Sequence, residues 1–437
     1  MKRKRPRVAF YTLGCKVNQS ETEAMGALFK ERGYNIVDFA DPADVYVINT
    51  CTVTHLADRK SRQVIRRCRK NNPGAKVVVA GCYSQVSPQE VERIPGVNLV
   101  VGTLEKNRIV EWLEEMGEDA GQPVLKVRDL CEARDFEDLE IDRVIGRTRA
   151  YLKIQDGCEQ YCSYCIIPYA RGPGRSRPKP GVLREARRLI AAGFKEIVLT
   201  GIHLGAYGRD LDAGASLEDL LPELLALSGD VRWRLSSLEP TEVSGALLEI
   251  MASFPNICPH LHLPLQSAHD EILKTMNRPY STGEYRKVIE RVRTVLPDIA
   301  VTTDIMVGFP GETDEHFKVY PGFIEEMAFS RLHVFKFSPR RGTPAALFEG
   351  QVPASVSEER SRQMIRLGER LARRYAGRFV GRTLRVLAET EKGEGCWEGH
   401  SENYLLIEFA SAKTQRGDIV SVRLERANGD KCRGSGP

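Results

Sequence analysis

The chain has 437 residues, of which 42% are hydrophobic and 28% charged, and its net charge at pH 7 is +5. This length is too great for one hydrophobic core, so we expect two or three domains. No apolar run approaches the roughly 18 residues of a transmembrane helix, so we expect no membrane partner and a cytoplasmic location. The 11 cysteines follow no export signal, which favours metal chemistry over disulfides.

The first third of the chain alternates strands with helices. This alternation predicts a doubly wound parallel sheet in residues 1–117. Ser20 and Glu23 match a capping box, which would start the first helix at Ser20. The expected strands are 8–13, 44–50 and 76–80, and the expected helices are 20–32 and 56–70.

One cysteine follows each of these strands, at Cys15, Cys51 and Cys82. Ligands of such sheets bind beyond the carboxyl ends of the strands, so the three thiols should meet at one edge. A lone cysteine is most often an inert small hydrophobic residue. Three in equivalent positions predict a metal site with three thiolate ligands. Structural roles are expected for Cys68, Cys131, Cys258, Cys396 and Cys432.

The middle of the chain begins with a charged stretch, 118–146, which we expect to be a linker with one short strand at 123–127. From 147 to 376 the alternation resumes with six strand–helix units, too few to close an eight-stranded barrel. The expected strands are 149–155, 196–201, 231–236, 260–263, 300–307 and 331–337. The expected helices are 184–192, 217–228, 243–253, 285–295 and 312–327.

The stretch 157–168 carries a second set of cysteines, Cys158, Cys162 and Cys165. A zinc site usually takes four protein ligands, whereas three thiolates leave one iron of an iron–sulfur cube open. This spacing, with Tyr164 before the last cysteine, resembles that of radical S-adenosylmethionine (SAM) enzymes. The resemblance implies an open partial (βα)6 barrel and cluster-borne generation of a 5′-deoxyadenosyl radical from SAM. Three buried structural cysteines are the alternative.

Three N-terminal segments narrow the resemblance. They are Gly-Cys-Lys-Val-Asn-Gln-Ser-Glu-Thr at 14–22, Asn-Thr-Cys-Thr-Val-Thr at 49–54 and Ala-Gly-Cys-Tyr at 80–83. Together they resemble the methylthiotransferase family, in which these cysteines hold an auxiliary [4Fe–4S] cluster. Lys16-Val17-Asn18 is similar to the MtaB-like branch, which acts on N6-threonylcarbamoyladenosine in tRNA. The branches acting on isopentenyladenosine or on a ribosomal protein carry other residues there.

The carboxyl ends of the central strands should hold SAM and the substrate. We expect Tyr164 to pack near the adenine, and Gly201 to let the backbone approach the SAM amino group. Ser237 and Glu239 offer polar groups to the ribose or the amino group, and Asp304 lies in the fifth strand. Ordinary loop capping is the alternative for each residue.

Three basic groups are candidates for contact with the phosphate backbone of RNA. Arg62 and Arg66 lie on the expected helix 56–70, Arg366 and Arg370 lie on a helix before the last domain, and Arg171 follows the cluster loop. A solvated helix face is the alternative.

Residues 377–437 change to short strands, expected at 383–389, 404–409 and 418–424, which predict a small β-barrel. This barrel occupies the place of the RNA-binding TRAM domain of the family, and its RNA role rests on the resemblance.

The resemblance implies a complete reaction: methylthiolation of carbon 2 of N6-threonylcarbamoyladenosine at position 37, beside the anticodon in the tRNA loop. It implies two [4Fe–4S] clusters, SAM, an external electron donor and a sulfur source. Positioned acids and bases could not functionalise this aromatic C–H, so a cofactor must supply the chemistry. The alternatives are a methylthiotransferase for isopentenyladenosine or a ribosomal protein, and a non-enzymatic iron–sulfur RNA-binding protein.

Overall fold

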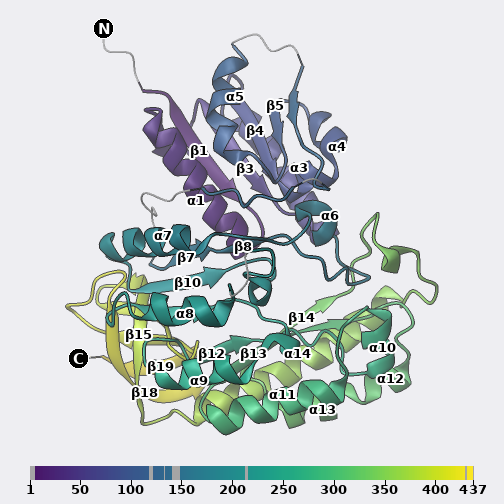
Figure 1. Ribbon diagram of the computed structural model, residues 1–437, viewed down its shortest axis with the longest axis vertical. Coiled ribbons are helices and arrows are strands. Elements are labelled where there is room, and N and C mark those ends of the chain that lie inside the picture. Colours follow the sequence, from purple (N-terminus) through teal and green to yellow (C-terminus); the bar gives the residue numbers. More distant parts are fainter. Residues whose placement is uncertain are drawn as a thin grey trace.

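The computed structural model describes residues 5–117, 122–131, 133–139, 148–211, 215–428 and 431–436. An N-terminal sheet (purple and blue in Figure 1) lies above a central arc of strands and helices (teal and green), and a small barrel (yellow) packs at the lower side. The expected linker 118–146 lies partly outside the described residues. No helix in the described part of the chain is long and apolar enough to span a bilayer.

The N-terminal sheet is parallel throughout, with the strand order β2-β1-β3-β4-β5-β6. Its strands are β1 (Arg7–Thr12), β2 (Asn35–Val37), β3 (Val45–Thr50), β4 (Lys76–Gly81), β5 (Val97–Val101) and β6 (Val124–Lys126). Its helices are α1 (Lys16–Glu31), α2 (His55–Asn71), α3 (Cys82–Val86), α4 (Pro88–Glu92), η1 (Lys106–Arg108) and α5 (Ile109–Glu115). Val47 packs with α1 and α5 on one face, and Ile48 packs with α2 on the other. The prediction of a doubly wound sheet is confirmed.

Two local predictions in this region differ from the structure. Helix α1 begins at Lys16, with Cys15 at its N-cap position, so Ser20 is not the cap. Gly14, at φ 105°, turns the chain directly from β1 into the helix, and Ser20 Oγ instead donates to Tyr151 O at 3.3 Å. The strand expected inside the linker is β6, which pairs with β5 at the edge of the N-terminal sheet.

The central arc contains six parallel strands. They are β7 (Ala150–Lys153), β10 (Glu196–Thr200), β11 (Arg232–Leu235), β12 (His260–His262), β13 (Ala300–Val307) and β14 (Arg331–Lys336). Single bridges, such as that between Ser237 and His262, connect the β11 half to the β12 half. This open arrangement confirms the expected partial barrel. A short hairpin of β8 (Gln155–Asp156) and β9 (Arg175–Ser176) lies beside it.

Helices accompany the strands of this arc, and most of them cover its outer face. They are α6 (Ile167–Arg171), α7 (Lys179–Ala191), α8 (Leu217–Leu225), α9 (Gly245–Ser253), α10 (Asp270–Thr275), α11 (Thr282–Val295), α12 (Asp314–Lys318), α13 (Tyr320–Met327) and α14 (Ala354–Gly377), with the single turns η2 (Leu204–Ala206), η3 (Pro240–Glu242) and η4 (Pro344–Leu347). The helix expected at 312–327 is divided at Val319. Pro321, in the first turn of α13, explains the division, because it has no N–H to donate to the carbonyl of Phe317 and its ring clashes with that carbonyl.

The C-terminal barrel is closed in the order β15-β16-β17-β19-β18. Its strands are β15 (Thr383–Gly393), β16 (Cys396–Ser401), β17 (Leu406–Ala410), β18 (Ile419–Asn428) and β19 (Lys431–Ser435). Trp397, Ile407 and Val422 fill its interior. The small barrel was expected, although β16 and β19 were not recognised. Arg232 and Arg234 of β11 fasten it to the central arc by donating to the backbone oxygens of His400 and Ser401.

Candidate active site

The N-terminal cysteines follow three neighbouring strands. Cys15 comes after β1, Cys51 after β3 and Cys82 after β4, and the register pairs Thr50 of β3 with Gly81 of β4. A Cβ atom at Gly14 would lie 3.1 Å from Cys51 Sγ, so only glycine lets the Cys15 turn approach so closely. Electrostatic interactions connect all three thiols. The structure therefore brings Cys15, Cys51 and Cys82 together at one edge of the sheet.

Burial makes two of these thiols, Cys51 and Cys82, poor anions without a cation. It raises the pKa of Cys51 to about 12 and also raises the pKa of Cys82. A bound metal reverses this preference, because thiolates are its ligands and its charge compensates theirs. The N-terminal triplet is therefore chemically suited to a metal cluster.

A buried ionic network lies behind this triplet and joins it to the central arc. Arg171 Nη1 lies 2.7 Å from Glu21 Oε1 and 3.1 Å from Asp156 Oδ1, and Lys153 Nζ lies 2.9 Å from Glu21 Oε1. Asn18 accepts from Arg171 and donates to Leu13 O and Thr50 O at 2.8 Å each. The network fixes the ends of β1 and β3 against the central domain.

The second triplet lies in the loop after β8. Gly157, at φ 75°, opens the loop, and a Cβ there would lie 1.8 Å from Pro173 O. Cys158 N donates to Gly172 O at 3.0 Å, and Cys165 N donates to Cys162 O at 2.9 Å. These contacts fold the loop so that it carries Cys158, Cys162 and Cys165 in one short turn.

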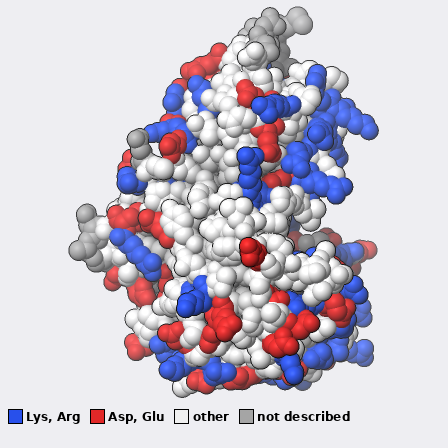
Figure 2. Space-filling model, turned by 90° about the vertical axis from the view of Figure 1, so that its right-hand side faces the viewer, with Lys and Arg blue, Asp and Glu red and all other residues white. Residues whose placement is uncertain are grey.

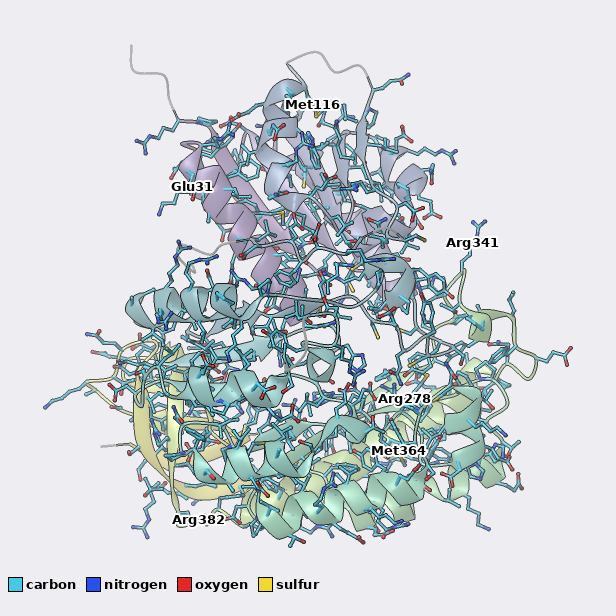
Figure 3. The ribbon with its side chains drawn as sticks, viewed as in Figure 1. Glu31, Met116, Arg278, Arg341, Met364 and Arg382 are labelled. Carbon is cyan, nitrogen blue, oxygen red and sulfur yellow. The ribbon has the colours of Figure 1, made fainter. Side chains whose placement is uncertain are left out.

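Arg278 lies against this loop, in the interior of the central domain (Figure 3). Its Nη1 donates to Cys162 Sγ at 3.2 Å, while Nη2 pairs with Glu239 and donates to Tyr280 Oη at 2.9 Å. Its charge therefore faces both a thiol and a carboxylate. Sequence reasoning missed Arg278, because nothing in its local pattern places it beside a loop more than a hundred residues earlier.

His203 approaches the first cysteine of the same loop. Its Nδ1 lies 3.8 Å from Cys158 Sγ, and its Nε2 lies 2.7 Å from Glu242 Oε1. A cavity of about 180 Å³ is lined by Cys158 and His203 together with Gln155, Glu159 and Arg209. The surroundings of Cys158 are thus polar.

One loop after β14 contacts both cysteine sites. Arg340 Nη2 donates to Thr52 Oγ1 at 2.7 Å, next to Cys51. Ala345 N donates to Ser163 O at 2.8 Å, inside the second cysteine loop. The loop after β14 therefore contacts both sites, and each triplet follows the carboxyl ends of its own set of strands.

The residues expected to contact SAM are spread over the same strand ends. Tyr164 packs 6.4 Å from the Phe309 ring centroid, and burial raises its pKa. Gly201 lies so close to Gln155 that a Cβ would come within 3.0 Å of its Oε1. Ser237 bridges to β12, and Asp304 Oδ2 lies 3.3 Å from His262 Nε2. Of these expected SAM contacts, Glu239 is connected to a cysteine, because Arg278 pairs with Glu239 and also donates a hydrogen bond to Cys162.

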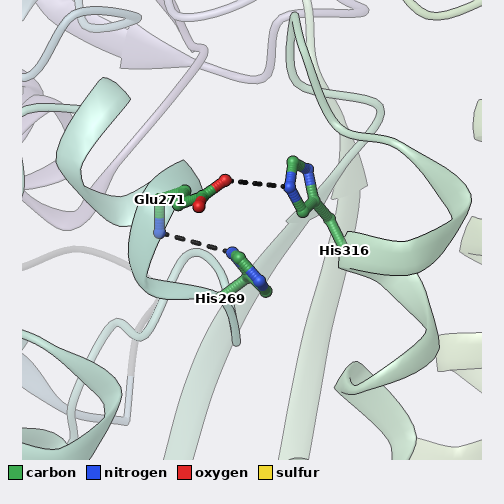
Figure 4. Close-up of side chains that lie close together, drawn as sticks. All are labelled: His269, Glu271 and His316. Carbon is green, nitrogen blue, oxygen red and sulfur yellow. Dashed lines mark hydrogen bonds and ion pairs between the residues drawn. The ribbon is translucent and has the colours of Figure 1, made fainter.

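A separate group of metal-ligating side chains lies in the central domain. Within the described residues, the ligand atoms of His269, Glu271 and His316 lie within 4.8 Å of one another (Figure 4). His269 Nδ1 accepts from Glu271 N at 3.3 Å, and His316 Nε2 lies 3.1 Å from Glu271 Oε2. Each cysteine triplet instead offers three thiols, the number that leaves one iron of an iron–sulfur cube open.

The basic residues fall into three different environments. Arg171 is fully buried in the ionic network, so the prediction that it contacts RNA is wrong. Arg366 and Arg370 are exposed on α14 but lie 3.6 Å from Glu359 and 3.0 Å from Glu325. These two arginines therefore have acidic partners on the protein itself.

Helix α2 keeps its exposed cations unpaired. Arg62 Nη1 donates to Tyr83 Oη at 3.0 Å. No acidic group within 4 Å is found, in the part of the chain that the structure describes, for the exposed side chains of Arg59, Lys60, Arg66, Arg67, Arg69 and Lys70. Figure 2 shows Lys and Arg gathered over the N-terminal half of the molecule. This surface is suited to an anionic partner.

Known protein families match the two parts of the chain that carry the cysteine triplets. Residues 7–102 match the family described as "Uncharacterized protein family UPF0004", and residues 152–320 match the radical SAM superfamily. Threonylcarbamoyladenosine tRNA methylthiotransferase MtaB of Bacillus subtilis is 44% identical over 426 residues, covering 96% of this chain and 94% of that protein. A protein of the same name from Thermotoga maritima is 38% identical, with 96% and 94% covered. A tRNA-2-methylthio-N(6)-dimethylallyladenosine synthase of Clostridium botulinum is 31% identical, with 95% and 94% covered.

Solved structures share the fold. The radical SAM methyltransferase TsrM of Kitasatospora setae has a TM-score of 0.59 at 15% identity, covering 79% of this chain and 77% of that chain. The cobalamin-dependent enzyme OxsB has a TM-score of 0.52 at 12% identity, covering 79% and 55%. These identities are low, so the likeness concerns the fold alone. Taken with the two family matches and the full-length relatives, it leads to one conclusion: the chain is an enzyme of the radical SAM tRNA methylthiotransferase family.

Proposed function

We propose that the protein inserts a methylthio group at carbon 2 of N6-threonylcarbamoyladenosine at position 37 of tRNA. Four relatives named for this modified base, at 36–44% identity, support the choice of substrate. The matched dimethylallyladenosine synthase is 31% identical. The observation that carries the proposal is the pair of three-cysteine sites that the loop after β14 contacts, since the reaction needs a radical and a sulfur at the same carbon.

The cofactors of this reaction are SAM and iron–sulfur clusters. A radical SAM enzyme uses SAM with one [4Fe–4S] cluster, and we assign that cluster to Cys158, Cys162 and Cys165. We assign a second [4Fe–4S] cluster to the N-terminal triplet. When bound, these groups supply the radical that takes a hydrogen from an unreactive aromatic carbon and the sulfur that replaces it.

The protein's own residues hold and orient the reacting groups. Arg278 donates to Cys162 and so favours its thiolate form, while Glu239 holds the other side of the guanidinium. Glu239, Ser237 and Asp304 are polar groups at the strand ends that would receive the SAM amino group and ribose. Tyr164 closes the apolar side next to Phe309, which excludes water from a radical site.

RNA docking is assigned first to helix α2. Its exposed cations are free to contact phosphates, and Arg62 and Arg66 are part of this face. Arg366 and Arg370 on α14 are already paired, so their contribution should be smaller. The C-terminal barrel, in the position of a TRAM domain, would add a further RNA contact.

Two further partners follow from the chemistry. The clusters need an external electron donor, and each turnover consumes a sulfur atom that some donor must replace. Action on tRNA would place the protein in the cytoplasm.

The test is nucleoside mass spectrometry after incubating the anaerobically reconstituted enzyme with SAM, a reductant and tRNA that contains N6-threonylcarbamoyladenosine. The proposal predicts the 2-methylthio derivative of this nucleoside. Methylthiolation of isopentenyladenosine tRNA instead, or SAM cleavage without any modified nucleoside, would contradict it.

A further inference from the structure

Two histidines and a glutamate come together where α10 meets α12. His269 is the N-cap residue of α10, Glu271 lies in the first turn of that helix, and His316 lies on α12. The centroids of the two imidazole rings are 4.4 Å apart, and His316 Nε2 lies 3.1 Å from Glu271 Oε2, 45 residues away along the chain. Two separate helices thus bring three side chains of metal-ligating types to one place (Figure 4).

The distances within this group suit a transition-metal ion. Two histidines, one glutamate and a water are an established ligand set of zinc. Two ligand atoms about 2.1 Å from a tetrahedral zinc lie about 3.4 Å apart, so the pair His316 Nε2 and Glu271 Oε2 needs to open by only a few tenths of an ångström. The third ligand atom, from the half-buried ring of His269, lies within 4.8 Å of the other two. A small rotation of that ring would complete the set.

Backbone groups hold the two rings in place. His316 Nδ1 lies 3.2 Å from Gly311 O. When this nitrogen carries the proton and donates to the carbonyl, Nε2 presents its lone pair, which is the arrangement found behind metal-bound histidines. The same Nδ1 lies 3.2 Å from Thr313 N, and His269 Nδ1 accepts from Glu271 N at 3.3 Å. Helix capping without a metal is therefore the other account of this group, and the experiment below separates the two.

Helix α10 connects this group to the second cysteine loop. At the far end of the helix, Ser163 N donates to Met276 O at 3.0 Å and Ser163 Oγ donates to Thr275 O at 2.8 Å. Helix α12 is itself fastened to α14, because Arg360 Nη2 lies 2.7 Å from Asp314 Oδ1. An ion shared by α10 and α12 would therefore fix the helix on which the cysteine loop rests.

We propose that His269, Glu271 and His316 bind a divalent transition-metal ion such as zinc, at a site distinct from both cysteine triplets. Imidazole nitrogens favour zinc, nickel or copper, whereas magnesium and calcium prefer ligand sets made of oxygen. Water takes the remaining coordination position. The ion ties α10 to α12 and so restrains the support of the cysteine loop. This inference does not depend on which nucleoside the enzyme modifies.

The test uses the reconstituted holoenzyme, in which the clusters occupy the cysteines. The protein is dialysed anaerobically against micromolar zinc chloride with excess magnesium, and zinc and iron are then counted per chain. The wild type should take up about one zinc without losing iron. His269→Gln, His316→Gln and Glu271→Gln should each weaken zinc binding by roughly 100-fold or more, because loss of even an outer-shell partner of a metal costs 10- to 100-fold. The Glu271 side chain is 76% exposed, so its replacement leaves the packing intact.

The matched control is His55→Gln, exposed at the start of α2, which should bind zinc as the wild type does. Zinc should also slow hydrogen exchange of the amides of residues 270–277 in the wild type and not in His316→Gln. Absence of zinc uptake by the wild type would leave helix capping as the role of the group and overturn the proposal. Equal zinc uptake by the wild type and all three variants would place the ion elsewhere, and would overturn it as well.

Discussion

Arg171 shows how burial decides the role of a single basic residue. In the sequence it resembles the other arginines near the cluster loop, but its side chain is fully buried between Glu21 and Asp156. Burial opposes its charge, yet the two carboxylates raise its pKa well above the usual range. The residue is therefore a structural link between the N-terminal sheet and the central arc.

Replacing Arg171 with Met should destabilise the fold. Removing one partner from a buried ionic network costs about 3–5 kcal/mol. The lower end applies here, about 3 kcal/mol, because Lys153 still pairs with both carboxylates and Lys106 still pairs with Glu21. Urea unfolding followed by tryptophan fluorescence measures the change. Arg67→Met, on the exposed face of α2, is the matched control, and an equal loss in both variants would contradict this account.

Gly157 should tolerate no side chain. Alanine there would place its Cβ 1.8 Å from Pro173 O and displace the loop of Cys158, so we expect loss of the iron bound by that loop and of SAM cleavage. Gly193 also has a positive φ, of 89°, but a Cβ there meets nothing within 4 Å. Gly193→Ala should therefore keep both properties. Iron analysis and 5′-deoxyadenosine release measure the difference, and retention of both by Gly157→Ala would be inconsistent with the packing.

Sequence patterns identified the residues whose role follows from their position along the chain. The cysteines stand at strand ends or at a short fixed spacing, and both features are visible in the chain. Arg278 has no such signal, because its approach to Cys162 depends on how the turn after α10 packs on the cysteine loop. The orientation of Arg171 is likewise set by tertiary packing.

At the scale of elements, α2 and α14 are two basic helices with different electrostatic surroundings. Both show arginines at helical spacing, which made them equivalent in the sequence. In the structure, Glu359 and Glu325 pair with Arg366 and Arg370 of α14, whereas the exposed cations of α2 have no acidic group within 4 Å among the described residues. Acidic partners on another helix, such as Glu325 on α13, cannot be recognised from the spacing of one helix.

This difference predicts unequal effects on tRNA affinity. The double variant Arg66→Gln with Lys70→Gln should weaken binding and reduce the slope of log affinity against log salt by about 0.7–0.9 for each lost phosphate contact. The double variant Arg366→Gln with Arg370→Gln should change the slope less. Fluorescence anisotropy across a series of salt concentrations measures both. A larger effect of the α14 pair would reverse the assignment of the docking surface.

The boundaries of strands and helices were predictable where the run of apolar residues was long. The parallel strands of both domains carry apolar runs, and most were located. The short strand β2, three residues long, offers too little pattern and depends on its neighbours in the sheet. The strand β6 was located, but its pairing with β5 in the N-terminal sheet could not be predicted from three residues. The capping box at Ser20 was misleading because β1 passes through Gly14 into α1, which begins at Lys16, four residues before the apparent cap.

At the scale of the whole molecule, the C-terminal barrel is fastened to the central arc through Tyr404. The rings of His260 and His400 lie 4.7 and 4.8 Å from the Tyr404 ring, and the Arg234 guanidinium lies 4.6 Å from it. Burial, helped by Arg149 and Arg234, lowers the pKa of His400 to about 3, and burial also lowers the pKa of His260. Both imidazoles are therefore neutral in the folded protein.

These histidines should make the fold sensitive to acid. Their folded pKa values lie below the unfolded value of about 6.5, so the unfolded chain binds more protons below that pH. Stability should be complete above about pH 6.5 and fall with each unit below it, by at most about 1.4 kcal/mol per histidine. The urea midpoint between pH 7 and pH 5 measures this, and the variants His260→Gln and His400→Gln should show a shallower fall. His55→Gln, exposed at the start of α2, should keep the wild-type dependence, and an unchanged slope in the first two variants would contradict the argument.

The central claim is that two separate sets of three cysteines each hold an iron–sulfur cube. Anaerobic iron and sulfide analysis of the intact chain tests it most directly, beside a variant with Cys15, Cys51 and Cys82 changed to Ala and a control with Cys68, Cys258 and Cys432 changed to Ala. The account predicts about eight irons in the intact chain and in the control, and about four in the variant that lacks the N-terminal triplet. Full iron in that variant, or an equal loss in the control, would contradict it.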